Sequence, residues 1–174
     1  ILSDSPPEKD VQWSEEGMVA SYKFIQKFWL LHKKVMKKTT LNNESGSSKL
    51  LASFTNTLIN KVTKNLENFH YNVIVANFHE TYNFLIKEIE KPINSFELVK
   101  NYKKILNLLQ PVIPHFALEC LEEVGEKSNP TWPVADLKLI EKETFNIGTT
   151  ILMPERTGRN STLGARWVTL MQDS

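Results

Sequence analysis

Apolar residues recur at three- and four-residue intervals along most of the chain, a spacing that predicts amphipathic α-helices. None of these periodic segments shows the strict alternation of a half-buried β-strand. The predicted fold is therefore all-α, an antiparallel bundle of four or five helices joined by short loops. The predicted helices run from Glu15 to about Lys38, from about Lys49 to Phe69, from the joint at Phe69–Asn72 to about Glu90, and from Asn94 onward.

The prolines at 111 and 114 leave the number of helices open. Either the fourth helix stops and a fifth begins with Pro114 in its first turn, or one helix kinks twice. The apolar stripe continues from Phe116 to Val124, and Gly125 is a plausible terminating residue.

The start of the first helix is strongly marked. Pro6 and Pro7 cannot continue a helix from upstream, and Ser14 is suited to cap the helix that follows. Trp13 and Met18 have the spacing of a hydrophobic staple, which fixes the angle at which the chain enters a helix. We therefore expect Pro6, Pro7 and Trp13 to have structural roles.

The first helix carries a wide apolar face, which we expect to pack against partner helices. Within it, His32 is expected to be a core histidine with satisfied hydrogen bonds, and Trp29 to be structural. The face comprises Met18, Tyr22, Ile25, Trp29, His32 and Met36, widened by Phe24, Phe28, Leu31 and Val35.

A second face of this helix is basic. Lys23, Lys27, Lys34 and Lys38 fall within about 60° of one another at about 100° per residue, and Lys33 and Lys37 flank them. Residues 20–64 hold nine lysines and a single acid, Glu44. Such a row is often only a solvated surface. The lack of acids among these lysines favours a localised positive field, whose natural partner is a polyanion.

Length and composition are those of one globular domain: 174 residues, of which 41% are hydrophobic and 24% charged. No apolar run approaches the roughly 18–20 residues of a membrane span, and the acidic, proline-bearing start does not resemble a signal peptide. The single cysteine, Cys120, fits a reducing compartment. The start at Ile1 favours a piece of a longer chain.

Changes in composition divide the chain into four segments. A lead-in (1–13) precedes the helical bundle (14–127), and a connector (128–146) holds Trp132, to which we assign a structural role. The last segment (147–174) contains all three arginines and no lysine. We expect this tail to be atypical: a vector-encoded extension, the product of a shifted reading frame or a separate natural segment, and poorly packed or only loosely attached.

No arrangement of residues predicts catalysis. The histidines do not pair with acids or with Cys120 at a metal-ligand spacing, so no metal site is predicted. His115 follows Pro114 in a predicted first turn, and both are expected to be structural. Glu119, Glu122 and Glu123 are expected to form the solvated face of a short helix. The sequence thus predicts a binding domain.

Four stretches resemble the helical tRNA-binding domain of bacterial leucyl-tRNA synthetase, and together they cover about residues 1–146. They are Ser5–Gly17 with the helix bearing Phe24 and Trp29, the aromatic-Asn entry Tyr71–Ala76, the Pro-x-x-Pro-His-x-Ala-x-Glu run Pro111–Glu119, and Trp132-Pro133. The resemblance implies a fragment of a cytoplasmic class I aminoacyl-tRNA synthetase, with tRNA and the missing catalytic domain of the same chain as partners.

By this resemblance, ATP and magnesium belong to the parent enzyme, and this fragment holds no cofactor and no catalytic residue. The resemblance implies no membrane and no obligate protein partner. We expect Lys23, Lys27, Lys33, Lys34, Lys37 and Lys38 to face the tRNA backbone. The alternatives are the equivalent domain of an isoleucyl-, valyl- or methionyl-tRNA synthetase, or a non-enzymatic helical interaction module whose basic face meets an acidic partner.

Overall fold

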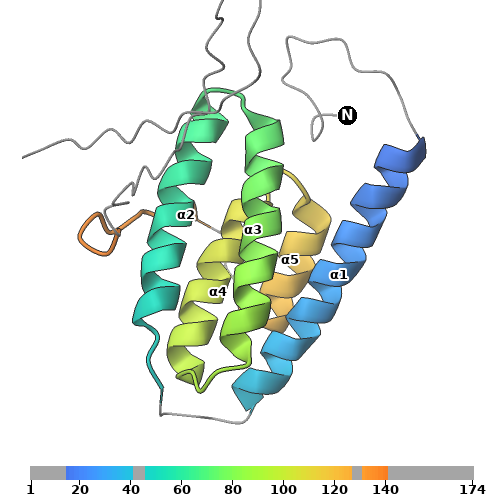
Figure 1. Cartoon of the computed structure of the whole chain (residues 1–174). Helices are drawn as coiled ribbons and strands as arrows, with labels where there is room; N and C mark the ends of the chain where they lie inside the picture. Colours follow the sequence, from blue (N-terminus) through green and yellow to red (C-terminus); the bar gives the residue numbers. More distant parts are fainter. Residues whose placement is uncertain (1–14, 41–45, 127–130, 141–174) are drawn as a thin grey trace, which may run out of the picture. The chain divides into compact units, whose positions relative to one another are not determined.

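The computed structural model describes residues 15–40, 46–126 and 131–140. Its helices follow one another up and down, so that each runs opposite to the one before it (Figure 1). The all-α prediction is confirmed for this part of the chain. The helices are α1 (Glu15–Thr40), α2 (Lys49–Glu67), α3 (Tyr71–Ile89), α4 (Ser95–Leu109) and α5 (Pro114–Glu123). None of them is long and apolar enough to cross a lipid bilayer.

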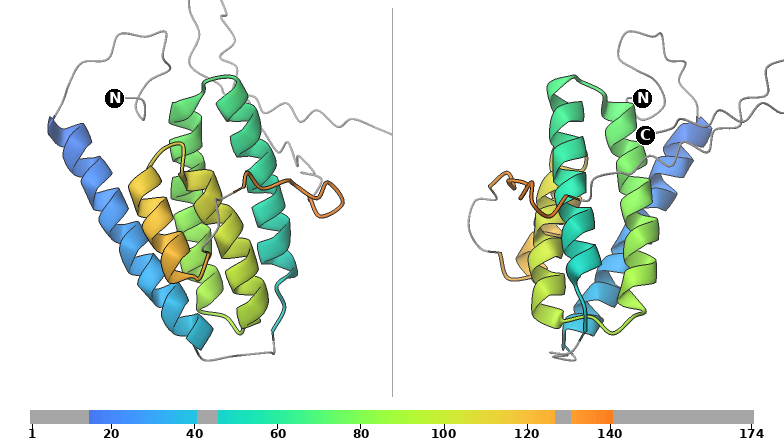
Figure 2. Two further views of the ribbon diagram at one scale, coloured as in Figure 1. Left: turned by 180° about the vertical axis from the view of Figure 1, so that it is seen from behind. Right: turned by 60° about the vertical axis from the view of Figure 1, so that its left-hand side comes forward.

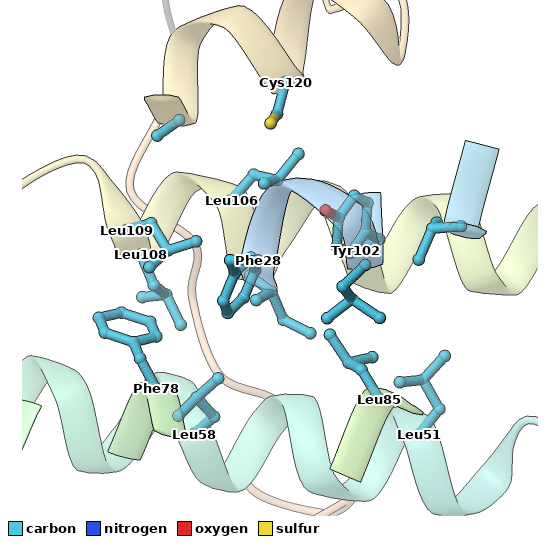
Figure 3. Packing of buried hydrophobic residues seen from close by; sticks show 14 of the residues in the cluster. Phe28, Leu51, Leu58, Phe78, Leu85, Tyr102, Leu106, Leu108, Leu109 and Cys120 are labelled. Carbon is cyan, nitrogen blue, oxygen red and sulfur yellow. The ribbon is translucent and has the colours of Figure 1, made fainter. Parts of the chain in front are cut away.

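Helix α4 lies at the centre of the bundle, in contact with α1, α2 and α5. Leu98, Tyr102, Ile105 and the run Leu106–Leu109 are buried on it, so it is covered on nearly all sides. Figure 3 shows Leu108 of this helix next to Phe78 of α3, and Leu106 on the side that faces Cys120 of α5. Burial of this apolar surface, at about 25 cal/mol per Å², is the main stabilising contribution.

The separate fifth helix is confirmed. Helix α4 ends at Leu109, and Pro114 is the first residue of α5, where its missing N–H leaves no hydrogen bond unmade. Helix α5 ends in a Schellman motif: the Glu126 N–H donates to the Leu121 carbonyl (2.9 Å), and the N–H of Gly125 donates to the Glu122 carbonyl (2.9 Å). Gly125 adopts φ 84°, the left-handed conformation that this motif requires.

Hydrogen bonds and backbone conformations close to the helix ends determine where other helices begin and end. The Asn94 side chain caps α4 by accepting a hydrogen bond from the Glu97 N–H at 3.1 Å. The second helix ends two residues before the boundary predicted at Phe69. Helix α2 ends at Glu67, and Phe69 adopts φ 58° and is 63% exposed in the turn to α3.

Gly46 is held in the approach to α2 by close contact between two backbones. A Cβ atom at this position would lie 2.5 Å from the Pro92 carbonyl oxygen and 2.8 Å from the Ile93 Cα atom. With φ 134° as well, the position accepts only glycine without a shift of the backbone.

The described part of the connector, residues 131–140, lies along α2 (Figure 2). The Trp132 indole N–H donates to the Thr63 hydroxyl (3.0 Å), and the Asp136 backbone N–H donates to the Asn56 side-chain oxygen (2.7 Å). Through these two hydrogen bonds Trp132 and Asp136 tie the connector to the bundle.

Candidate nucleic-acid interface

Helix α1 is packed along only part of its length. Its buried residues are Phe28, Leu31, His32 and Val35, and no residue from 15 to 27 is buried. The sequence placed Met18 and Tyr22 on the inward face, and this is wrong: they are 54% and 61% exposed. The reason is geometric, because the first turns of α1 project away from the other helices (Figure 1).

The lysine face of α1 is accessible and uncompensated. The side chains of Lys23, Lys27, Lys34 and Lys37 are exposed, and that of Lys38 is half-buried. None of these five forms an ion pair with any residue in the ranges that the structure describes. Their charges are therefore available to an external anion.

Lys33 differs from the other lysines of the predicted set. Its Nζ atom donates to both carboxylate oxygens of Glu123 on α5, at 2.7 and 2.8 Å. The same ammonium group lies 4.3 Å from the centre of the Trp29 ring, within range of a cation–π interaction. Lys33 thus takes part in holding α1 to α5, whatever else it contacts.

Beside Lys33, His32 is fully buried and joins three helices. Its Nδ1 atom lies 3.1 Å from the Tyr102 hydroxyl of α4, and its Nε2 atom lies 2.9 Å from the Glu123 carboxylate. The tautomer that satisfies both partners carries its proton on Nε2 and accepts the Tyr102 O–H at Nδ1. The prediction of a satisfied core histidine is confirmed. The prediction that Glu123 is merely solvated is wrong.

The environment shifts the titration of these groups. Burial lowers the pKa of His32, and the nearby Glu123 carboxylate only partly offsets this effect. Hydrogen bonds from Lys33 and then from His32 lower the pKa of Glu123. Burial raises the pKa of the Cys120 thiol to about 12. At neutral pH the cluster therefore holds a neutral imidazole, a carboxylate and an unreactive thiol.

Next to this cluster, a shallow groove of about 470 Å³ opens between α1 and α5. Its walls are mainly apolar and are formed by Ile25, Gln26, Trp29, Leu30 and Phe116. The rings of Trp29 and Phe116 meet edge to face, with centroids 6.1 Å apart. Trp29 is half-buried and contributes to this surface.

The remaining predicted residues are spread over the molecule. Pro114 begins α5, and His115 is exposed in the first turn of that helix. Pro6, Pro7 and Trp13 lie outside the described residues, as does the tail from 147 to 174. Among the residues that are described, no three His, Cys, Asp or Glu side chains are grouped so as to hold a metal ion.

Sequence reasoning missed the partners of His32. Tyr102 and Glu123 lie 70 and 91 positions away along the chain, so no local pattern pairs them with His32. The available signals were the burial expected for a histidine on an apolar face, and an acid at the end of the fifth helix.

The fold and the surface together define a class of protein: a helical bundle whose first helix exposes a row of lysines that form no ion pair with the residues the structure describes. The sequence pattern of the family "Anticodon-binding domain of tRNA ligase" matches residues 48–158. The chain belongs to this family. The match extends beyond residue 147, so the first part of the arginine-bearing tail lies within it.

Among curated proteins, the relatives that the chain resembles are leucine–tRNA ligases. The chain is 32% identical over 162 residues to a leucine–tRNA ligase of Fusobacterium nucleatum, a match covering 84% of this chain and 19% of that one. It is also 32% identical over 151 residues to a leucine–tRNA ligase of Rickettsia bellii, covering 84% and 18%. The chain thus spans about a fifth of the length of these relatives.

A solved structure shares the fold. The chain superimposes with a TM-score of 0.70 on part of the agnB2 LeuRS of Agrobacterium radiobacter K84, determined as a ternary complex with tRNA and LeuAMS. The sequence identity is 21%, and the match covers 80% of this chain and 19% of that one. The helical arrangement is therefore that of a segment of a larger ligase.

Proposed function

We propose that this chain is the tRNA-binding helical domain of a leucine–tRNA ligase, and that it positions tRNA for ATP-dependent leucylation elsewhere in the parent enzyme. The observation that carries the proposal is the row of α1 lysines without ion pairs in the described structure. Membership of the anticodon-binding family and likeness to leucine–tRNA ligases support it. These relatives favour a leucyl enzyme over isoleucyl, valyl or methionyl ones.

The chemistry of the surface suits folded RNA. The major groove of an A-form duplex is too deep and narrow for side chains to read, so a protein meets such a duplex through phosphates, sugars and shape. A row of ammonium groups on a rigid helix attracts phosphates whatever the base sequence, and the attraction weakens with salt. We therefore assign backbone contact to Lys23, Lys27, Lys34, Lys37 and Lys38, and a supporting role to Lys33.

Other parts of the reaction belong to the rest of the parent chain. The described residues offer no grouped ligands for magnesium, and the sequence has no glycine-rich phosphate loop. We therefore propose that ATP and magnesium bind to a catalytic domain outside this segment, and that the parent enzyme works in the cytoplasm. In this proposal the segment contributes tRNA binding and no catalytic residue.

The test is tRNA binding by charge-reversed variants of the 174-residue chain. Lys27→Glu with Lys34→Glu is compared with Lys100→Glu and Lys138→Glu, which reverse two exposed lysines outside α1. We expect the α1 pair to weaken tRNA affinity by at least about tenfold at low salt and the control pair by less than about threefold. Equal losses in both pairs would remove α1 as the contact surface.

A further inference from the structure

The turn between α2 and α3 holds a bulky residue where the backbone favours glycine. Helix α2 ends in a Schellman motif: the His70 N–H donates to the Asn65 carbonyl (2.8 Å), and the Phe69 N–H donates to the Leu66 carbonyl (3.1 Å). This motif places Phe69 in the left-handed region, with φ 58°. At the end of α5 the same motif has Gly125 at the corresponding position. A phenylalanine there is strained, at a cost in stability that glycine avoids.

The fold gains little from the Phe69 side chain. Phe69 is 63% exposed, and its ring meets the half-buried Tyr71 ring loosely, with centroids 6.4 Å apart and an angle of 55° between the planes. One exposed ring needs no explanation by itself. An exposed ring on a strained backbone does need one, because strain that packing does not offset gathers at functional sites.

The residues around Phe69 indicate what kind of partner the ring suits. Glu67, Asn68 and His70 are exposed and polar, so the turn offers no continuous apolar patch to a protein surface. A nucleic-acid base needs only one flat aromatic partner, and polar neighbours can bond to its edges. Lys64 and Glu67 in the last turn of α2 balance each other in charge, so the attraction for phosphates has to come from elsewhere.

That attraction is present at the same end of the bundle, where the unpacked half of α1 lies (Figures 1 and 2). The Phe24 ring of α1, between Lys23 and Lys27, has its centroid 4.2 Å from that of His79 on α3. From His79 back to the start of α3 is about 12 Å of helix. An RNA held by these lysines can therefore reach Phe69, since one RNA-binding domain can span about 16 base pairs.

We propose that Phe69 is a stacking platform for an unpaired base of the bound tRNA. This inference rests on the proposed function and adds to it a contact that does not depend on charge. The left-handed backbone holds the ring outward at the tip of the α2–α3 turn, so the strain of this residue serves binding. The base stacks on the exposed face of the ring while the α1 lysines hold the phosphates.

The test compares binding of bulk tRNA and of a fully paired RNA duplex by variants of the 174-residue chain. Phe69→Gly removes both ring and strain, Phe69→Leu keeps apolar bulk without an aromatic face, and Phe69→Trp offers a larger aromatic face. Phe96→Ala is the matched control, because Phe96 is a phenylalanine that is 73% exposed in the first turn of α4.

We expect Phe69→Gly and Phe69→Leu to weaken tRNA binding at least about fivefold, and Phe69→Trp to bind tRNA at least as tightly as the native chain. Phe96→Ala should change tRNA affinity, and all variants should change duplex affinity, by less than about twofold. Phe69→Gly should unfold at the native temperature or up to about 4 °C higher, because glycine relieves the left-handed strain. A binding loss in this variant would then not come from a weakened fold.

Salt dependence distinguishes the ring from the lysines. Because stacking involves no phosphate charge, Phe69→Gly should lower tRNA affinity by the same factor at every salt concentration and leave the slope against salt unchanged. Equal losses for tRNA and duplex, or native affinity in Phe69→Leu, would overturn the proposal. Native affinity in Phe69→Gly beside a loss in Lys27→Glu with Lys34→Glu would overturn it while tRNA binding stands. Native affinity in all these variants would overturn both.

Discussion

The two halves of α1 belong to one continuous helix and have opposite surroundings. From Phe28 to Val35 it contributes four buried residues, among them His32, which is bonded to two other helices. From Glu15 to Lys27 none of its residues is buried, although Met18, Tyr22 and Phe24 are large and apolar. The second half supplies the buried core residues of α1. The first half adds the partly buried Phe24, whose ring centroid lies 4.2 Å from that of His79, so most of the first half is free to serve recognition.

The comparison explains how one helix presents two surfaces. The packed half fixes the rotation of α1 about its axis, since Phe28, Leu31 and Val35 must face the core. Because an α-helix is rigid, that rotation also fixes where the lysines and the outer apolar residues point. Substitutions and changes of pH test this division, in order of decreasing expected effect on stability.

The largest difference is expected between truncations in the two halves. Phe28→Ala removes a fully buried ring and should lower the free energy of unfolding by about 3–5 kcal/mol. Tyr22→Ala removes an exposed ring and should change it by less than about 0.5 kcal/mol. Urea titrations of both variants measure the two values. Similar losses would mean that the first half is packed after all.

Substitutions at two glycines test the backbone contact between the approach to α2 and the turn at Pro92 and Ile93. Gly46→Ala places a Cβ against the Pro92 carbonyl and should cost about 2–3 kcal/mol. Gly125→Ala is the matched control, because its φ is also positive but no atom lies within 4 Å of the added Cβ. It should cost only the left-handed strain, about 1 kcal/mol. Equal melting temperatures for the two variants would contradict the backbone contact.

The pH dependence of stability probes the packed half through His32. Its pKa is lowered in the folded chain, so below the unfolded value of about 6.5 the unfolded chain binds a proton that the folded chain refuses. The stability contributed by neutral His32 is therefore present above that pH and is lost as the pH falls through the folded pKa. Urea unfolding at pH 7 and pH 5.5 should show a smaller loss for His32→Gln than for the native chain.

The stability that Glu123 contributes changes at lower pH than that of His32. Its pKa is also lowered, so its contribution is present above the unfolded value of about 4.5 and is lost as the pH falls further. Glu123→Gln should therefore flatten the acid limb below pH 4.5 and leave the His32 step in place. A single shared step removed by either variant would mean that the two groups titrate as one.

The smallest effect on stability is expected on the lysine face. Lys27 and Lys34 are exposed and form no ion pair within the described structure, so reversing both to Glu should change the free energy of unfolding by less than about 0.5 kcal/mol. Thermal unfolding of this variant and of the native chain measures the difference. A loss above 1 kcal/mol would show that these lysines support the fold.

Local signals in the sequence predict much of the fold. Apolar periodicity, the Asn94 cap and the proline at 114 predict the helices and most of their ends, because these features act within a few residues. The exposure of Met18 and Tyr22 was missed, because periodicity shows that a face is apolar and not what covers it. The His32–Glu123 pair was missed because it joins residues that only the tertiary fold brings together.

The sequence predicts the positive charge of the candidate interface but not how its side chains are paired in the fold. The lysine row follows from helical spacing and from the absence of acids among those residues. The pairing of Lys33 with Glu123 depends on how α5 packs, so the sequence placed Lys33 with the other five. In the described structure Lys33 is paired with Glu123, whereas the other five lysines form no ion pair.

The central claim, that the α1 lysines meet RNA phosphates, is tested most directly by the salt dependence of tRNA binding. The slope of the logarithm of the binding constant against the logarithm of salt concentration is measured for the native chain, for Lys27→Glu with Lys34→Glu, and for Lys100→Glu with Lys138→Glu. Each lost phosphate contact should reduce the slope by about one. We predict a reduction of about two for the α1 pair and none for the control pair; an unchanged slope for the α1 pair would contradict the account.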